Sequence, residues 1–315
     1  MNRAKTVTIV CWVISAVALL GLVVWFLLGS VFGTAIGFDF GGETFEPLET
    51  QRVSVSGIDA IEIEWVAGAV YVGTHSGDEI LVTEFTRRNL REDQHMLIHT
   101  DGGTLAIQFS ARRSIQGGNM PAKQLEVLIP EAISQDFAEI QVSTVSGRVV
   151  VGDVHAGVMT ISTTSGRIVM NNVAAQTIHA STTSGRIEVL GAEAEEMSLR
   201  TVSGRIETGN VETQVLRTHT TSGRHELSGS FGDVNARSTS GRIEIVSLIV
   251  PDNIVADATS GRVEVTVPQG DVVSVWYSTS SGRFRSEIPV VTSGSADAQF
   301  RLSTSSGRIS IFALS

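Results

Sequence analysis

The sequence predicts an all-β protein: a single-stranded parallel β-helix, or β-solenoid, with about 19–20 residues per coil. Two observations carry this prediction. The tripeptide Ser-Gly-Arg occurs nine times, and successive copies are 18 to 25 residues apart. Apolar and polar residues alternate on both sides of each tripeptide, which is the period of a β-strand. We expect right-handed winding, because parallel β crossovers are almost always right-handed.

Each repeat has the same inner positions. The residue two before the repeated Ser is Thr in seven of nine repeats, and the residue six before it is apolar in all nine. We therefore expect two good strands and one short side per coil, with Thr and Ser hydroxyls pointing inward near the corner. The apolar residues are Ile140, Met159, Ile178, Met197, Leu216, Val234, Ile254, Val275 and Phe300.

Glycine at each corner indicates either a positive φ or a close approach of two backbones, since other residues tolerate both poorly. The nine corner glycines are Gly147, Gly166, Gly185, Gly204, Gly223, Gly241, Gly261, Gly282 and Gly307.

The arginines of the repeat are predicted to point outward, beside glutamates that stand two residues later in five repeats. One interpretation is a charge-balanced, solvated face that also blocks lateral strand pairing. The other is an anion-binding stripe for a polymer with repeating negative charge. The glutamates favour the first, because they cancel much of the positive field. The candidate ligand or partner surface comprises Arg148, Arg167, Arg186, Arg205, Arg224, Arg242, Arg262 and Trp276.

Trp276 stands at an outward position beside an inward Tyr277, close to the insertion "SEIPVVTSGSADAQF". It either contacts a sugar or protein partner or, as we expect, packs beneath the inserted loop.

Residues 6–28 contain no charged residue, and 23 residues can cross a bilayer as one helix. Arg3 and Lys5 precede them, so we expect a cytoplasmic N-terminus and an extracytoplasmic β-helix on a single-pass anchor in the cell membrane. A cleaved signal peptide is disfavoured by the length of the run and the lack of a clean cleavage site. The predicted divisions are the stub and anchor at 1–28, a linker at 29–44, an N-terminal β cap at 45–142 and the nine coils at 143–315.

A solenoid exposes an open β edge at each end unless it is capped. We expect the strands within 45–142 to form the first cap, with "HSGDEI" at 75–80 as a degenerate coil. At the other end, Phe312 and Leu314 suggest an open last coil that could associate end to end with another molecule.

Composition excludes several classes of function. The net charge is −10, which argues against nucleic-acid binding and against lying flat on anionic lipid. The single cysteine excludes an internal disulfide framework. His95 and His99 would be about 13 Å apart on a strand, too far to share a metal, and we expect His225 to be a hydrogen-bonded core residue. No nucleophile elbow or carboxylate cluster of a polysaccharide-active enzyme is present, so we predict no cofactor, no metal and no catalysis.

The anchor followed by "IEIEWVAGAVYV", "LEVLIPEAI" and "IQVSTVSGRVVV" resembles the bacterial putative-adhesin β-helix domain family, over residues 50–315. The resemblance implies an envelope-associated protein of unknown function, without a catalytic motif to transfer. That family often has Asp after Ser-Gly, whereas this chain has Arg nine times.

We therefore expect a non-catalytic adhesin or cell-envelope scaffold, with envelope polysaccharide or another envelope protein as its partner. The first alternative is an accessory to an envelope-stress or signalling system that acts through a membrane partner. The second is a polysaccharide-active enzyme.

Overall fold

The computed structural model describes residues 45–87, 90–110, 123–134, 137–269, 272–291 and 298–314. The chain divides into two compact units, Met1–Thr44 and Phe45–Ser315, and all nine repeats belong to the second. The apolar run at 6–28 lies outside the described residues, among which no helix is long and apolar enough to span a membrane.

The described part of the second unit is built from β-strands and two single-turn 3₁₀ helices, η1 (Glu92–Gln94) and η3 (Glu131–Ile133). The strands are β1 (Glu46–Ser54), β2 (Ala60–Ala67), β3 (Val70–His75), β4 (Glu79–Thr86), β5 (Leu97–Asp101), β6 (Thr104–Gln108), β7 (Lys123–Pro130), β8 (Phe137–Ser146), β9 (Val149–Gly152), β10 (His155–Ser165), β11 (Ile168–Ser184), β12 (Ile187–Ser203), β13 (Ile206–Ser222), β14 (His225–Ser240), β15 (Ile243–Ser247), β16 (Asn253–Ser260), β17 (Val263–Pro268), β18 (Val273–Ser286), β19 (Val290–Val291) and β20 (Ala298–Leu314).

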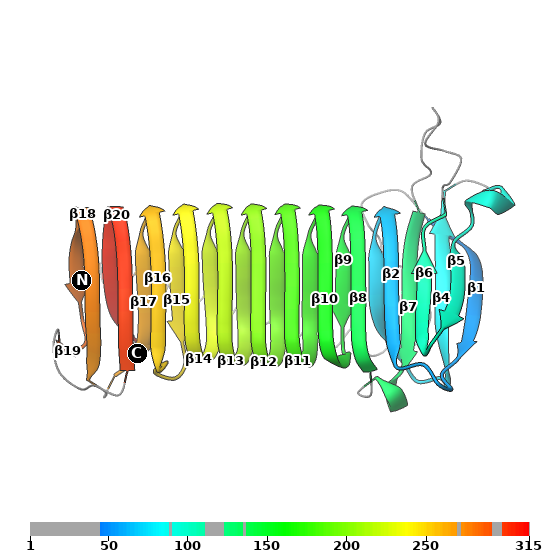
Figure 1. Cartoon of the computed structure of the whole chain (residues 1–315), viewed down its shortest axis with the longest axis horizontal. Coiled ribbons are helices and arrows are strands. Elements are labelled where there is room, and N and C mark those ends of the chain that lie inside the picture. The colour runs from blue at the N-terminus through cyan, green and yellow to red at the C-terminus, as the bar shows by residue number, and fades with distance from the viewer. Residues whose placement is uncertain are drawn as a thin grey trace, which may run out of the picture. The chain divides into compact units, whose positions relative to one another are not determined.

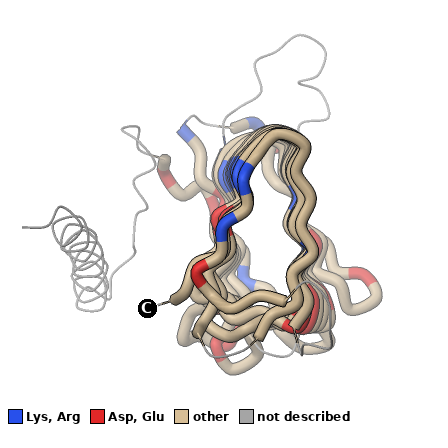
Figure 2. Tube along the Cα trace, turned by 90° about the vertical axis from the view of Figure 1, so that its left-hand side faces the viewer, with Lys and Arg blue, Asp and Glu red and all other residues tan. Residues whose placement is uncertain are grey.

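The repeats stack as parallel coils, as the sequence predicts, and they keep their register apart from an irregularity between Thr208 and Val211. Ser165 pairs with Ser146 on one side and Ser184 on the other, and the same alignment continues coil after coil. Figure 1 shows the coils side by side, and Figure 2 looks along the stack, where their traces superpose. Equivalent residues therefore form columns with a spacing of about 4.8 Å.

The core lies inside the coils and is filled by the predicted apolar columns. The column two before each Ser is also buried except at Thr279, and Thr144 donates a hydrogen bond to Thr163 over 2.9 Å between their hydroxyl oxygens. The repeated Ser is different: Ser146 and Ser165 are exposed, which corrects the expectation of an inward Ser column. The strand alternation stops where the chain turns, so two successive residues at the corner both face solvent.

The corner glycines are required by a close approach between coils. A Cβ on Gly204 would lie 1.7 Å from the carbonyl oxygen of Gly185, and each of the nine corner glycines has such a contact at 1.6–1.8 Å. Any side chain at these positions would therefore force neighbouring coils apart.

The N-terminal region forms a regular coil next to the repeats and a cap at the far end. Gly68, between β2 and β3, joins the glycine column, because Gly147 faces its carbonyl oxygen. β6 and β7 stack next on β2 and β3, and then β5 and β4 pair antiparallel to them, with β1 outermost along β4. The expectation for "HSGDEI" was wrong: His75 bonds through its ring to Glu79 O and Gly77 N, closing a turn that reverses the chain between β3 and β4.

Beneath this cap lies a buried ion pair. Lys123 Nζ is 2.6 Å from Glu84 Oε1, with side chains 0% and 1% exposed. The ammonium also donates to Gln94 O and lies 4.1 Å from the centre of the Phe109 ring. Burial lowers the pKa of Lys123, and the bond to Glu84 opposes that change. The pair closes the N-terminal end of the apolar core.

The other end is not closed by the last repeat. β20 pairs with β16 and β17 on one side and with β18 on the other, so the C-terminal strand lies inside the stack (Figure 1). Phe312 and Leu314 pair with Thr266 and Pro268, which corrects the expectation of an open last coil. The outermost coil is β18, carrying β19 along its first residues. We call β20 and β18 the distal coils.

Candidate functional site

The predicted arginine column carries an alternating set of ion pairs, here called the Arg–Glu ladder. Arg186 reaches Glu188 at 2.8 Å and Glu207 at 4.0 Å, and Arg205 reaches Glu207 at 3.9 Å and Glu226 at 3.4 Å. The pattern continues with contacts to glutamate from Arg167, Arg224, Arg242 and Arg262. Arg148 stands at the start of the column.

The ladder is better described as a charge-balanced, solvated face than as an anion-binding stripe. Its arginine side chains are 34–48% exposed, so each pair contributes little to stability. The hydrogen bond that Arg186 donates to Glu188 raises the pKa of Arg186, which keeps that guanidinium charged and engaged. Carboxylates between successive guanidiniums cancel the field that would attract a polyanion.

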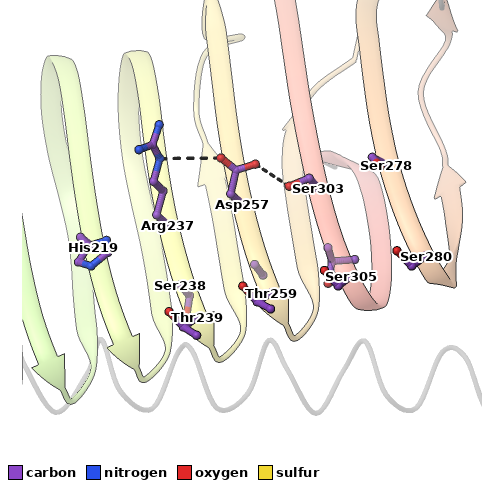
Figure 3. Close-up of a pocket in the computed structure, with 12 residues that line it drawn as sticks. His219, Arg237, Ser238, Thr239, Asp257, Thr259, Ser278, Ser280, Ser303 and Ser305 are labelled. Carbon is purple, nitrogen blue, oxygen red and sulfur yellow. Dashed lines mark hydrogen bonds and ion pairs between the residues drawn. The ribbon is translucent and has the colours of Figure 1, made fainter.

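A polar groove that our sequence analysis did not predict runs across the last coils (Figure 3). It has a volume of about 400 Å³. One column of its lining is His219, Arg237, Asp257, Ser303 and Ser278, which are in register from coil to coil. A second column along the same strands consists of Thr239, Thr259, Ser305 and Ser280. We call this surface the hydroxyl groove.

Fixed polar contacts organise the middle of the hydroxyl groove. Arg237 Nε is 3.8 Å from Asp257 Oδ2, and Ser303 donates a 2.6 Å hydrogen bond to Asp257 Oδ1 (Figure 3). Burial, Arg200 and Arg237 together lower the pKa of His219, so its imidazole is neutral at pH 7. The groove thus offers hydroxyls, a neutral imidazole and an oriented guanidinium on rigid strands.

This donor set suits binding better than hydrolysis. Glycoside hydrolysis ordinarily uses two carboxyl groups facing the bond that is cleaved. Asp257 is the single carboxyl group that lines the hydroxyl groove, and it is engaged by Arg237 and Ser303. Hydroxyls and a guanidinium can instead exchange hydrogen bonds with a polyol.

Trp276 is exposed on the outermost coil, contrary to our expectation that it packs beneath the inserted segment. Its exposed fraction is 55%, and Arg301 lies 4.7 Å from the ring centre. Tyr277 was expected to face inward but is 43% exposed, and it stacks on Phe284 with the ring centres 4.1 Å apart. β19 covers only the first residues of this coil, so the inner position at Tyr277 meets solvent. A second cavity of about 420 Å³ lies beside Trp276, lined also by Arg301, Gln299 and Asn253.

The histidines form no metal centre in the described part of the chain, where no group of three or more His, Cys, Asp or Glu could hold an ion. His225 is fully buried in the Ile206–Ile243 column. Neither of its ring nitrogens makes a hydrogen bond of normal geometry, and a weak contact to the backbone of Arg237 is what remains of the hydrogen bonding that we expect for this core histidine. Burial lowers its pKa to about 4, opposed by the backbone of Arg237 and assisted by His219.

A signal for the hydroxyl groove was present in the sequence. The residue three before the repeated Ser is Ser in the first three repeats, then Arg200, His219, Arg237 and Asp257. That change is visible only when the repeats are aligned by column. The order of the last two coils, which completes the groove, is not visible at all.

Comparison with known families agrees with this architecture. A family model described as Toastrack DUF4097 matches residues 58–312. The chain belongs to this family. Toastrack DUF4097 is thus the domain family of unknown function that the resemblance indicated.

Two solved structures share the Toastrack fold of this chain. A putative adhesin from Parabacteroides distasonis is 14% identical, with a TM-score of 0.55 over 83% of this chain and 96% of that one. A putative adhesin from Parabacteroides merdae is 11% identical, with a TM-score of 0.53 over 84% and 95%. At these identities the likeness establishes the fold alone. No curated protein matches the chain significantly.

Proposed function

We propose that this chain is a membrane-anchored, extracytoplasmic, non-catalytic adhesin that binds envelope polysaccharide in the hydroxyl groove. The observation that carries the proposal is the groove itself: two in-register polar columns, on rigid strands, with one engaged carboxyl group. The anchor is the uncharged run at residues 6–28. Solved relatives of the same fold described as putative adhesins support this role.

The columns suit an extended sugar chain. Neighbouring coils are about 4.8 Å apart, and alternate residues along a strand are about 6.6 Å apart, so hydroxyls recur over a wide flat area. Strands hold these groups in place before binding, which reduces the ordering cost of association. Trp276, beside the groove on the outermost coil, offers an apolar ring face to a sugar.

The test is co-sedimentation of the full chain, purified in detergent, with insoluble envelope polysaccharide. The groove variant replaces Ser278, Ser280, Ser303 and Ser305 by Ala. Its matched control replaces Ser162, Thr164, Ser181 and Thr183 by Ala, at equivalent columns in distant coils. We expect the groove variant to bind at least tenfold more weakly, and the control to bind like the unmodified chain. Equal binding by all three proteins, or equal loss in both variants, contradicts the proposal.

A further inference from the structure

The Arg–Glu ladder stops at the distal coils. From Glu188 to Glu264, a glutamate follows two residues after each repeat arginine. In β20 this position is Ser310, which is buried, and in β18 it is Arg285, which pairs with Glu287 at 3.0 Å. The column of arginines continues into both coils, but its neutralising carboxylates do not.

Two adjacent guanidiniums have no counter-charge among the described residues. Arg283 and Arg308 pair in register, and both are exposed. Among the described residues, no carboxylate lies within ion-pair distance of either side chain. Like charges at the spacing of one coil repel each other, and an anion between them would relieve that repulsion.

The arginine pair adjoins the hydroxyl groove around one corner of the distal coils. Along each of these strands, the groove residues Ser280 and Ser305 are followed by Ser281 and Ser306, whose hydroxyl oxygens are 3.3 Å apart. Arg283 and Arg308 come two residues later, beyond the corner glycines. A chain leaving the groove over this corner would meet paired hydroxyls and then paired guanidiniums.

We propose that Arg283 and Arg308 bind the carboxylate of an acidic sugar in a polysaccharide that occupies the hydroxyl groove. This assignment rests on the proposed function and names its substrate class: an acidic polysaccharide. Guanidinium groups match carboxylate geometry and bind it through paired, charge-assisted hydrogen bonds.

The surroundings favour a single polymer chain over an anionic membrane surface. The protein has a net charge of −10, so it would repel a broad anionic surface over most of the area of contact. A narrow acidic chain can follow the uncharged hydroxyls and present a carboxylate to the arginine pair alone. An anionic lipid headgroup is thus the competing outcome in the test.

The column of repeat arginines also provides the residues for a matched control. The test variant is Arg283→Gln with Arg308→Gln. The control is Arg186→Gln with Arg205→Gln, which removes two arginines of the same column that are paired in the ladder. Binding of the full chain in detergent is measured with polygalacturonic acid, with neutral dextran of similar length, and with glycerophosphoglycerol, the water-soluble headgroup of phosphatidylglycerol. Thermal unfolding by circular dichroism checks that both variants fold, as expected for exposed side chains.

We expect the distal variant to bind polygalacturonic acid at least tenfold more weakly, with binding of the unmodified chain falling as salt is raised. The control should remain within twofold of the unmodified chain. Equal loss in both variants would show a general charge effect and overturn the assignment. A variant that loses binding of glycerophosphoglycerol but keeps binding of polygalacturonic acid would assign the pair to lipid headgroups and also overturn the assignment.

The remaining outcomes separate the two proposals. If polygalacturonic acid does not bind while insoluble envelope polysaccharide still co-sediments, the acidic-sugar assignment fails and the proposed function stands. If neither polymer binds, both fail.

Discussion

Gly204 shows how one residue type maintains the whole stack. Its backbone lies so close to Gly185 that a Cβ would come 1.7 Å from the carbonyl oxygen. Real Cβ atoms do not approach carbonyl oxygens this closely, so a larger residue must separate the coils. The neighbouring Arg205 faces solvent, and its ion pairs with Glu207 and Glu226 are partly exposed.

We therefore predict that Gly204→Val lowers the free energy of unfolding by at least about 3 kcal/mol. Arg205→Ala, its neighbour, should change it by less than about 1 kcal/mol. Urea unfolding followed by circular dichroism measures both. Small and similar effects would mean that the coils can separate at little cost.

His225 links stability to pH. Its pKa in the folded state, about 4, lies below the ordinary value of 6.5. The unfolded chain therefore takes up the proton first, and stability falls as pH drops from about 6.5 to about 4. The full loss corresponds to about 3 kcal/mol at 1.36 kcal/mol per pKa unit.

His225→Ile should remove this part of the acid sensitivity, because Ile206 and Ile243 already occupy the neighbouring positions of the column. Urea midpoints at pH 7 and pH 4.5 would differ less in the variant than in the unmodified chain. His179→Gln is the control, since that side chain is exposed. An unchanged pH dependence in His225→Ile would contradict the assignment.

At the scale of elements, the C-terminal end depends on the exchange in order between β18 and β20. The inner positions of β20 include Phe300, Leu302 and Ile309, all fully or nearly fully buried. The corresponding positions of β18 are Val275, Tyr277 and Phe284, of which Tyr277 carries a hydroxyl that tolerates contact with water. Placing β18 outermost exposes Tyr277 and keeps the aliphatic Leu302 covered, so β18 acts as the distal cap.

Deleting residues 270–297 tests this cap. The deletion would bring Ser260 and Ser306 to a spacing of 18 residues, which already occurs between Ser222 and Ser240. We expect an all-β protein whose exposed β20 edge causes self-association, because open β edges pair with other chains. Size-exclusion chromatography with light scattering measures this.

The matched control deletes residues 186–204, one complete internal coil, and leaves both ends capped. Both deletions are made in a chain that starts at Phe45. The control should remain as monodisperse as that chain without a deletion. If both deletions behave alike, β18 has no capping role.

At the scale of the whole molecule, the anchor and the β-helix are predicted to have separable roles. The run at 6–28 lies outside the described residues, so membrane attachment stays a prediction from its length and lack of charge. We predict that the full chain resists alkaline extraction from membranes, and that removal of residues 1–28 releases it. Fractionation followed by immunoblotting measures this outcome.

Replacing residues 6–28 with an unrelated apolar span is the control for that deletion. An adhesin should keep both membrane attachment and polysaccharide binding after the exchange. Loss of function with attachment intact would favour the alternative of a signalling accessory that acts through a membrane partner.

The sequence alone determined the coil, its period and its corners. Strand alternation and the 19-residue spacing are local properties, repeated so often that parallel stacking is the arrangement that buries every apolar column. The Arg–Glu ladder follows for the same reason, since residues at equivalent positions must become neighbours. Even the unpaired Arg283 and Arg308 could have been found, because Arg285 and Ser310 stand where other repeats have Glu.

The tertiary structure decided which coil is last, what the corner serines face and where the hydroxyl groove lies. Every coil offers the same kind of edge, so strand alternation alone does not decide whether β18 or β20 stacks on β16. It is settled by which stacking leaves the least apolar surface in water. The groove follows from that choice, because Ser303 meets Asp257 only when β20 is inserted next to β16.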